Sequence, residues 1–181
     1  MRSERPGAAR DSYRCAVALL LLGLAGPFES SAPLAASGAR VRAVPAARAI
    51  AIGETVVVTV RIEGARDVGS TPFTLHFDPA ILEFVAGSAV EGSFLGRDGT
   101  ATSFLAAPGP ASRGGGVVVG LSRLRAGRGA QGKGVLCRLT FRARSPGITP
   151  VSFARANVLS PAASPLPVAF KATAIEVRPA R

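Results

Sequence analysis

The sequence has few of the residues that most metal centres and disulfide frameworks require. Its 181 residues include one histidine, two cysteines, one tyrosine and no tryptophan, and 11 Asp and Glu stand against 22 Lys and Arg. One histidine excludes a three-histidine zinc site within a single chain. Two cysteines exclude a disulfide framework if one of them is removed with a leader. Hydrophobic residues make up 48% of the chain, which is enough to bury the core of one domain of ordinary size.

The first 36 residues have the pattern of a secretory signal peptide. Several arginines precede an apolar stretch over 15–26, and small residues follow it up to Ala36. This stretch is too short to span a bilayer, so an uncleaved membrane anchor is the less favoured interpretation. Cys15 stands at the start of the apolar stretch rather than after it, which argues against lipid attachment. We expect a secreted protein in the periplasm or outside the cell, without a stable membrane anchor after cleavage.

The rest of the chain has the pattern of β-strands. Short apolar or alternating runs are separated by Gly, Pro, Asp and Ser; residues 55–62 are almost entirely β-branched, and residues 72–77 alternate. No stretch has a sustained helical period, so no helix is available to connect parallel strands. We therefore predict an all-β, two-layer, mainly antiparallel jelly-roll sandwich of about nine strands over 47–178, with 37–46 as a linker.

A glycine-rich segment at 127–134 resembles a phosphate-binding loop without its structural context. It satisfies a GxGxxG pattern and nearly a Walker A motif, but Gly134 stands where Ser or Thr should bind magnesium. Such a loop holds phosphate at the start of a helix. Residues 135–142 instead alternate with period two, which predicts a strand after a glycine-rich turn.

Cys137 belongs to this predicted strand and shares its apolar phase with Val135, Leu139 and Phe141. A cysteine in that position is expected to be a small buried core residue without a disulfide partner.

The carboxylates do not form a convincing catalytic pair. Asp78 precedes Pro79 in a turn, and Glu83 lies between two apolar residues, so neither suits glycoside hydrolysis. The remaining acids are scattered, and we expect no enzyme and no cofactor. A structural calcium ion is the open alternative, but no dense oxygen-ligand motif is present to hold one.

Four segments together resemble the cohesin domain, of which 69–77 is the strand segment before F-D-P. The other three are G-E-T and the following strand at 53–62, F-D-P-A-I-L-E-F-V at 77–85, and G-K-G-V-L-C-R-L-T-F at 132–141. The resemblance extends over about residues 44–178 and implies a nine-stranded jelly roll related to some carbohydrate-binding modules. In cellulosomes such domains bind dockerins, which are small calcium-loaded helical modules carried by enzymes. Similar domains occur in bacterial envelope proteins without a known dockerin, and a single copy without a dockerin segment is expected to belong to that outlying group.

The resemblance also implies a recognition sheet, which contains the strands at 72–77, 100–105 and 117–122. Its candidate partner-binding residues, with the phase of Thr102 left open and Arg123 placed at the rim, are Thr74, His76, Thr102, Val118, Gly120, Ser122 and Arg123. A lone outward histidine is more often solvated than a metal ligand. The small, weakly charged surface suits a protein interface or an ordinary sandwich surface equally.

We therefore predict a non-catalytic binding module that mediates protein–protein adhesion in an extracellular or envelope assembly, of the kind linked to polysaccharide degradation. Carbohydrate binding is one alternative; it is weakened because Trp is absent and Tyr13, which could stack on a sugar ring, lies in the leader. A structural subunit of a secretion or pilus apparatus is another.

The net charge of +11 could attract anionic glycans, membranes or nucleic acid. The arginines are scattered along the sequence, however, apart from Arg123, Arg125 and Arg128. A coding bias is therefore the simpler explanation, and nucleic acid is not an expected partner.

Overall fold

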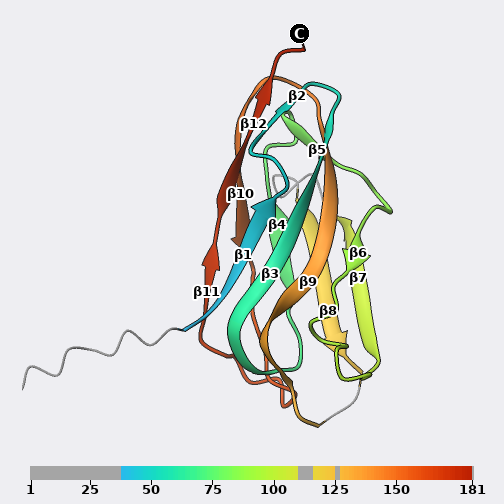
Figure 1. The fold of residues 1–181 in the computed structure, drawn as a ribbon, viewed down its shortest axis with the longest axis vertical. Coiled ribbons are helices and arrows are strands. Elements are labelled where there is room, and N and C mark those ends of the chain that lie inside the picture. The colour runs from blue at the N-terminus through green and yellow to red at the C-terminus, as the bar shows by residue number, and fades with distance from the viewer. Residues whose placement is uncertain (1–37, 110–115, 125–126, 181) are drawn as a thin grey trace, which may run out of the picture. The chain divides into compact units, whose positions relative to one another are not determined.

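The computed structural model describes residues 38–109, 116–124 and 127–180, and all regular structure in these ranges is β (Figure 1). Twelve strands form two six-stranded sheets. The predicted all-β sandwich is confirmed, although short strands make the number larger than nine. Within the described ranges no helix is long and apolar enough to cross a membrane. The predicted signal peptide at 1–36 lies outside the described residues.

The first sheet has the order β11-β1-β3-β9-β5, with β6 paired to β9. Its strands are β1 (Ala39–Pro45), β3 (Thr55–Val68), β5 (Leu82–Phe84), β6 (Val90–Glu91), β9 (Ala130–Ala143) and β11 (Val168–Lys171). The second sheet has the order β2-β12-β10-β4-β8-β7. Its strands are β2 (Ala49–Ala51), β4 (Phe73–His76), β7 (Thr102–Pro108), β8 (Val117–Arg123), β10 (Gly147–Ala154) and β12 (Thr173–Arg178).

The two ends of the described domain pass from the first sheet to the second side by side. β1 pairs in parallel with β11 in the first sheet, and β2 pairs in parallel with β12 in the second. Residues 46–48 connect the first two strands, and Ala172 alone separates the last two. The apolar run 168–177 is therefore two strands, because the chain changes sheets at Ala172.

The predicted linker at 37–46 is wrong, because most of it is β1. This strand pairs with both β3 and β11, and its Val41 is fully buried. Small apolar residues that alternate with arginine have the composition of a linker. They form a strand here because strands from distant parts of the chain pair with them and bury one side.

The two central strands of the first sheet are longer and less regular than the sequence pattern indicates. β3 continues to Val68, beyond the β-branched run that ends at residue 62, with register shifts and a positive φ at Gly64. In β9, Val60 pairs with Cys137 whereas Arg61 pairs with Val135, so Leu136 is an extra residue in a β-bulge. The phase predicted for Cys137, Leu139 and Phe141 is confirmed, but that of Val135 is wrong, because the bulge turns Leu136 inward instead.

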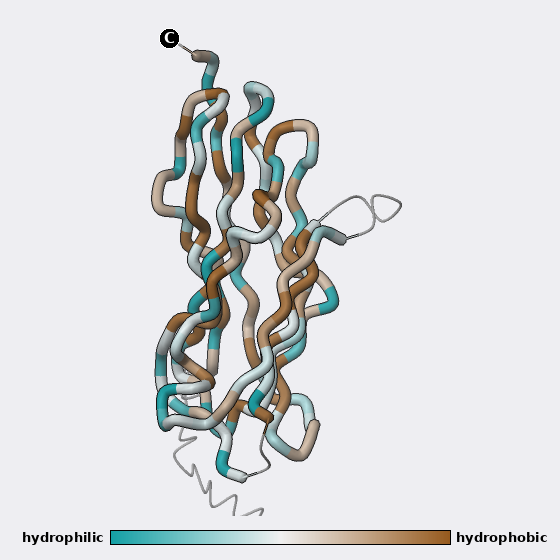
Figure 2. The backbone as a smooth tube through the Cα atoms, turned by 90° about the vertical axis from the view of Figure 1, so that its right-hand side faces the viewer, coloured by the Kyte–Doolittle hydropathy of each residue, from teal (hydrophilic) through white to brown (hydrophobic). Residues whose placement is uncertain are grey.

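The core lies between the sheets and consists of side chains in the inward phase of each strand. Phe141 packs edge-to-face on Phe77, with ring centroids 5.0 Å apart, and lies 5.9 Å from Phe84. Figure 2 shows the resulting alternation of hydrophobic and hydrophilic residues along the strands. Cys137 is fully buried and free, as predicted, and burial raises the pKa of its thiol to about 12.

The raised pKa of Cys137 predicts a loss of stability in alkali. The thiol keeps its proton in the folded state, whereas the unfolded state releases it above the ordinary cysteine value of 9.0. The free energy of unfolding should therefore be undiminished by this group below pH 9.0 and should fall as the pH rises from there toward 12. Cys137→Ala, which costs about 1 kcal/mol at neutral pH, should show a shallower alkaline decline in urea unfolding. Parallel pH curves for the two proteins would contradict this assignment.

Candidate partner-binding surface

The strands named in the sequence prediction lie next to one another in the second sheet. Thr74 of β4 pairs with Val118 of β8, which in turn pairs with Ala107 of β7, and Ala154 of β10 lies on the other side of Thr74. Cross-strand partners point to the same side of a sheet. The outer face of the second sheet therefore brings together five of the seven predicted residues, namely Thr74, His76, Val118, Gly120 and Ser122.

Thr102 and Arg123 do not belong to this face. They pair with each other across β7 and β8, in the same phase as the fully buried Val117 and the nearly buried Leu121. The Thr102 hydroxyl donates to Glu91 Oε1 over 2.5 Å. The phase of Thr102, which the sequence leaves open, is therefore inward. Arg123 has the same phase, because two consecutive residues of a strand cannot both face outward and Ser122 already does.

Arg123 instead anchors the loop before β7. Its side chain is 6% exposed; Nη1 donates to the Leu95 carbonyl over 2.6 Å, and Nη2 donates to Asp98 Oδ2 and Thr100 Oγ1, each over 2.6 Å. The hydrogen bonds from Arg123 and Thr100 hold the pKa of the Asp98 carboxyl well below its usual range. Arg123 is thus a fixed structural cation at the edge of the sheet.

The sequence analysis missed further outward residues on β7 and β10. Leu105 of β7 is 62% exposed and Ile148 of β10 is 69% exposed, and they lie on the same side of the sheet as Val118, which is 40% exposed. Leu105 pairs with Gly120, where an added Cβ would meet nothing within 4 Å. The phase of β7 was hidden because Phe104 and Leu105 are adjacent and both apolar, and only pairing with β8 separates them.

The outer face of β10, β4, β8 and β7 carries no Lys, Arg, Asp or Glu. We call these positions the neutral face: Ser103, Leu105, Ala107, Thr74, His76, Val118, Gly120, Ser122, Ile148, Pro150, Ser152 and Ala154. Charged residues resume on β12, where Glu176 and Arg178 form an ion pair. In a chain with a net charge of +11, this depletion is a distinct property of one surface.

His76 lies on the neutral face beside Ser152 of β10. Its Nδ1 lies 3.7 Å from the point that a Cβ at residue 116 would occupy, so Gly116 leaves room beside the ring. Among the described residues, no group of three or more His, Cys, Asp or Glu side chains is arranged to hold a metal ion. His76 therefore stands on this face as a polar side chain next to open space.

The other chemical motifs have structural roles. Asp78 Oδ1 accepts a hydrogen bond from the Ala80 amide over 2.8 Å, which confirms the predicted turn, and Glu83 is exposed, 4.0 Å from Arg144. The glycine-rich segment leads into β9 rather than a helix. Gly134 is required there because a Cβ would lie 2.9 Å from the ring of Phe94.

The family model that describes the cohesin domain matches residues 42–177. The chain belongs to the cohesin family. No curated protein matches it. Solved structures resemble this cohesin in fold, at low sequence identity.

One similar structure is a non-cellulosomal cohesin from the archaeon Archaeoglobus fulgidus, with 20% identity, a TM-score of 0.60, and coverage of 78% of this chain and 92% of that one. A second is the type II cohesin module from the adaptor scaffoldin ScaA of Acetivibrio cellulolyticus, with 15% identity, a TM-score of 0.66, and coverage of 79% and 92%. A third is the type I cohesin–dockerin complex Coh-OlpC–Doc435 from Clostridium thermocellum, with 15% identity, a TM-score of 0.60, and coverage of 78% and 94%.

The role of Arg123 as a loop anchor predicts a loss of stability when it is shortened. Arg123→Met should reduce the free energy of unfolding by about 2 kcal/mol, because the Leu95 carbonyl and the Thr100 hydroxyl lose a donor. The exposed Arg144→Met control should change it by less than about 0.5 kcal/mol in urea unfolding. Equal effects of the two substitutions would contradict the anchoring role.

The lowered pKa of Asp98 gives the same cluster an acid dependence. The stabilisation from its carboxylate is complete above the ordinary aspartate pKa of 3.8 and is lost as the pH falls toward the lower folded value. Asp98→Asn lacks this titration, so its stability should fall less than that of the unmodified protein when urea unfolding is compared at neutral and acid pH. A steeper acid decline in the variant would rule out this assignment.

Proposed function

We propose that this cohesin is a non-catalytic binding module that holds another protein against the neutral face, outside the cytoplasm. The observation that carries the proposal is the composition of that face. Exposed Leu105 and Val118 stand among small polar residues without a full charge, and exposed Ile148 lies at the margin of the face, where it pairs with Glu176 of β12. The cores of protein interfaces are depleted in charge in the same way.

The same face gives less support to a neutral sugar as the ligand. Flat sugar-binding surfaces usually stack sugar rings on aromatic side chains. Phe104 and Phe153 occupy the inward phase of their strands, and Phe153 packs against Phe73 at 5.4 Å and Phe170 at 5.3 Å. No aromatic ring other than the imidazole of His76 therefore stands on the neutral face.

A dockerin-type protein is the first partner to test. One of the similar solved structures is a cohesin–dockerin complex, and the family to which this chain belongs supports the same class of partner. Because the neutral face lacks full charges, the partner's contact surface should be mainly apolar and uncharged. Binding should consequently depend little on ionic strength. The module could belong to an assembly that degrades polysaccharide or to a secretion or pilus apparatus. The identity of the protein bound to the neutral face distinguishes these two settings.

The decisive variant is Gly120→Arg. Position 120 is open, so the new side chain should not disturb the fold, but it places a charge beside Leu105. We expect affinity for the partner to fall by about tenfold or more, since a charge at the centre of a desolvated interface is unfavourable. Interferometry with a panel of purified dockerin modules, and with any protein captured from the secreted fraction and then purified, measures this change.

Thr55→Arg is the matched control, because it adds the same charge to an exposed position on β3 of the other sheet. Val118→Arg should behave like Gly120→Arg. A partner that binds both neutral-face variants as tightly as it binds the control would show that the interface lies elsewhere.

A further inference from the structure

The outer face of the first sheet has the opposite chemistry to the neutral face. Lys171 of β11 pairs with Arg42 of β1, and Arg42 pairs with Arg61 of β3, so three cations stand in register on three adjacent strands. Adjacent strands are about 4.8 Å apart. Like charges directly opposite one another destabilise a sheet, so an arrangement of this kind calls for a compensating anion.

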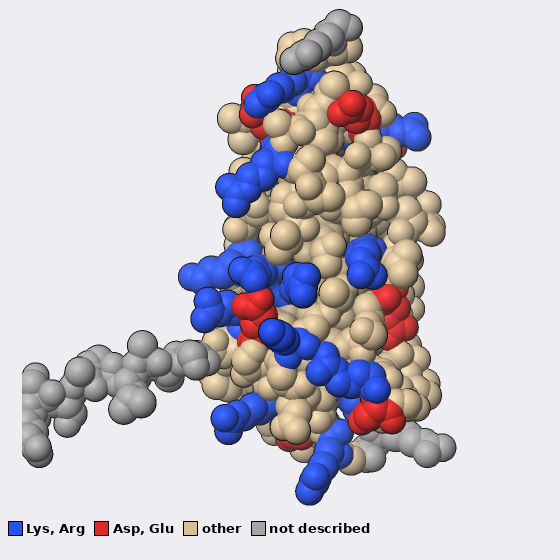
Figure 3. Space-filling model, viewed as in Figure 1, with Lys and Arg blue, Asp and Glu red and all other residues tan. Residues whose placement is uncertain are grey.

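The cations outnumber the acids around this row. Arg40 lies two residues before Arg42 on the same side of β1 and pairs with Glu63. Arg138 of β9 pairs with Thr59, and Arg48 precedes β2. Glu63 is the acid that bonds to the row, through Arg42. Within the described residues Arg48, Arg61 and Lys171 have no ion-pair partner. Figure 3 shows the basic side chains as a band across the lower half of this face.

A hollow of about 390 Å³ lies among these cations, and we call it the basic groove. Arg42, Arg48, Arg61 and Lys171 line it, and Val44 and Pro45 also contribute to the lining. Guanidinium groups bind carboxylate and sulfate oxygens through paired, charge-assisted hydrogen bonds. The apolar side chains suit the C–H faces of a sugar ring. The combination of cations and apolar surface matches a sugar that bears a carboxylate or a sulfate.

We propose that the basic groove binds an acidic polysaccharide. Four cations in one hollow, with Arg40 beyond it, exceed what a single small anion needs and suit a chain with repeated charges. Single-stranded nucleic acid would need aromatic side chains for base stacking, and the lining has none. A membrane surface is flat and would contact the rim rather than a hollow between strands. This inference goes beyond the proposed function and concerns the other sheet.

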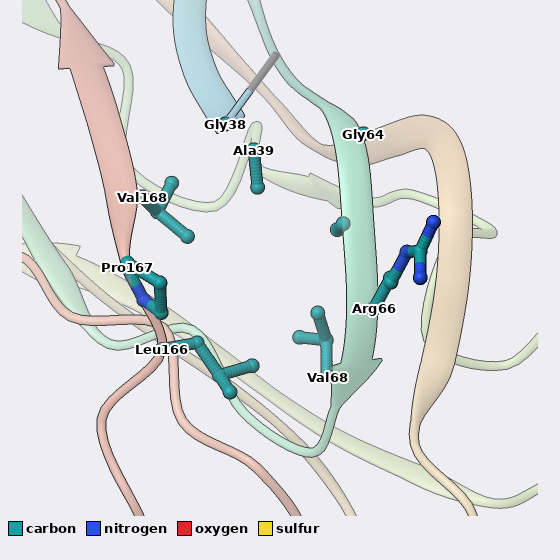
Figure 4. A pocket seen from close by; sticks show the side chains of 9 residues that line it. Gly38, Ala39, Gly64, Arg66, Val68, Leu166, Pro167 and Val168 are labelled. Atoms are coloured by element: carbon teal, nitrogen blue, oxygen red, sulfur yellow. The ribbon is translucent and has the colours of Figure 1, made fainter. Parts of the chain in front are cut away.

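A second hollow on the first sheet carries a weaker argument. A smaller one of about 230 Å³ lies at the ends of β1, β3 and β11 and is lined by Ala39, Ala65, Val68 and Leu166 (Figure 4). Its apolar side chains converge, whereas Arg66, the charged residue of its lining, points away from them. The basic groove is different because its charges define the ligand.

The test compares two double variants of equal charge. Arg61→Gln with Lys171→Gln removes two cations of the basic groove, and Arg128→Gln with Arg144→Gln removes two exposed cations elsewhere. The probes are polygalacturonate for carboxylate and dextran sulfate for sulfate, with neutral dextran as the blank, in affinity electrophoresis and calorimetry. We expect the groove variant to bind at least one acidic probe about tenfold more weakly and the control variant to change by less than about twofold. High ionic strength should abolish the difference.

Thermal unfolding separates loss of binding from loss of folding. Without a ligand the groove variant should melt at a higher temperature than the unmodified protein, because repulsion within the row is removed. Dextran sulfate should raise the melting temperature of the unmodified protein and of the control variant more than that of the groove variant.

Several outcomes would overturn the proposal. They are failure of the unmodified protein to bind either acidic polymer at low ionic strength, equal weakening in the two double variants, and a lower melting temperature of the groove variant without ligand. Tighter binding to a single-stranded oligonucleotide or to phosphatidylglycerol vesicles than to both glycans would overturn it as well. None of these results depends on the neutral face, so the proposed protein binding stands or falls separately.

Discussion

The pairing of β3 with β9 determines most of what this molecule presents on its surface. Both strands have 14 residues, and Val56, Val58 and Val60 of β3 face inward opposite Phe141, Leu139 and Cys137 of β9. Side chains alternate along a strand, so a slip of one residue would bury the arginines and expose this core. The bulge at Leu136 keeps Cys137, Leu139 and Phe141 facing inward, while Arg61 and its partner Val135 face outward. The register of this strand pair therefore fixes the core and the outward phase of Arg61, which lines the basic groove.

The two outer faces differ in charge although they belong to a single compact sandwich. The neutral face offers leucine, valine and isoleucine among small polar residues, and the basic groove offers closely spaced cations with little acidic compensation. Ionic strength distinguishes interactions of these two kinds, because salt screens charge–charge attraction and leaves burial of apolar surface largely intact. If both proposals hold, the module connects a partner protein on one sheet to an acidic matrix on the other, with the core as a rigid spacer.

The sequence predicts what local periodicity controls. The alternation in 72–77 places Phe73, Leu75 and Phe77 in the core and thereby turns Thr74 and His76 outward, as the structure has them. It does not reveal what depends on distant pairing. The sequence of β1 resembles a linker, because its small residues are buried only through pairing with β3 and β11. The side of the sheet that Thr102 faces is determined by its pairing with β8. Arg42, Arg61 and Lys171 are far apart in the sequence, so their alignment in one row is a property of the register alone.

The distribution of arginine between the faces bears on the coding-bias explanation for the high charge. A bias in codon usage acts on every position of the gene without regard to the side of a sheet that the residue will occupy. It would therefore place arginine on the outward positions of β4, β7, β8 and β10 as often as on those of β1, β3 and β9. The first set has none, whereas the second includes Arg40, Arg42, Arg61, Arg138 and Arg142. A bias can supply the arginines, but it does not account for their segregation between the two surfaces, which is the distribution that two different ligands would favour.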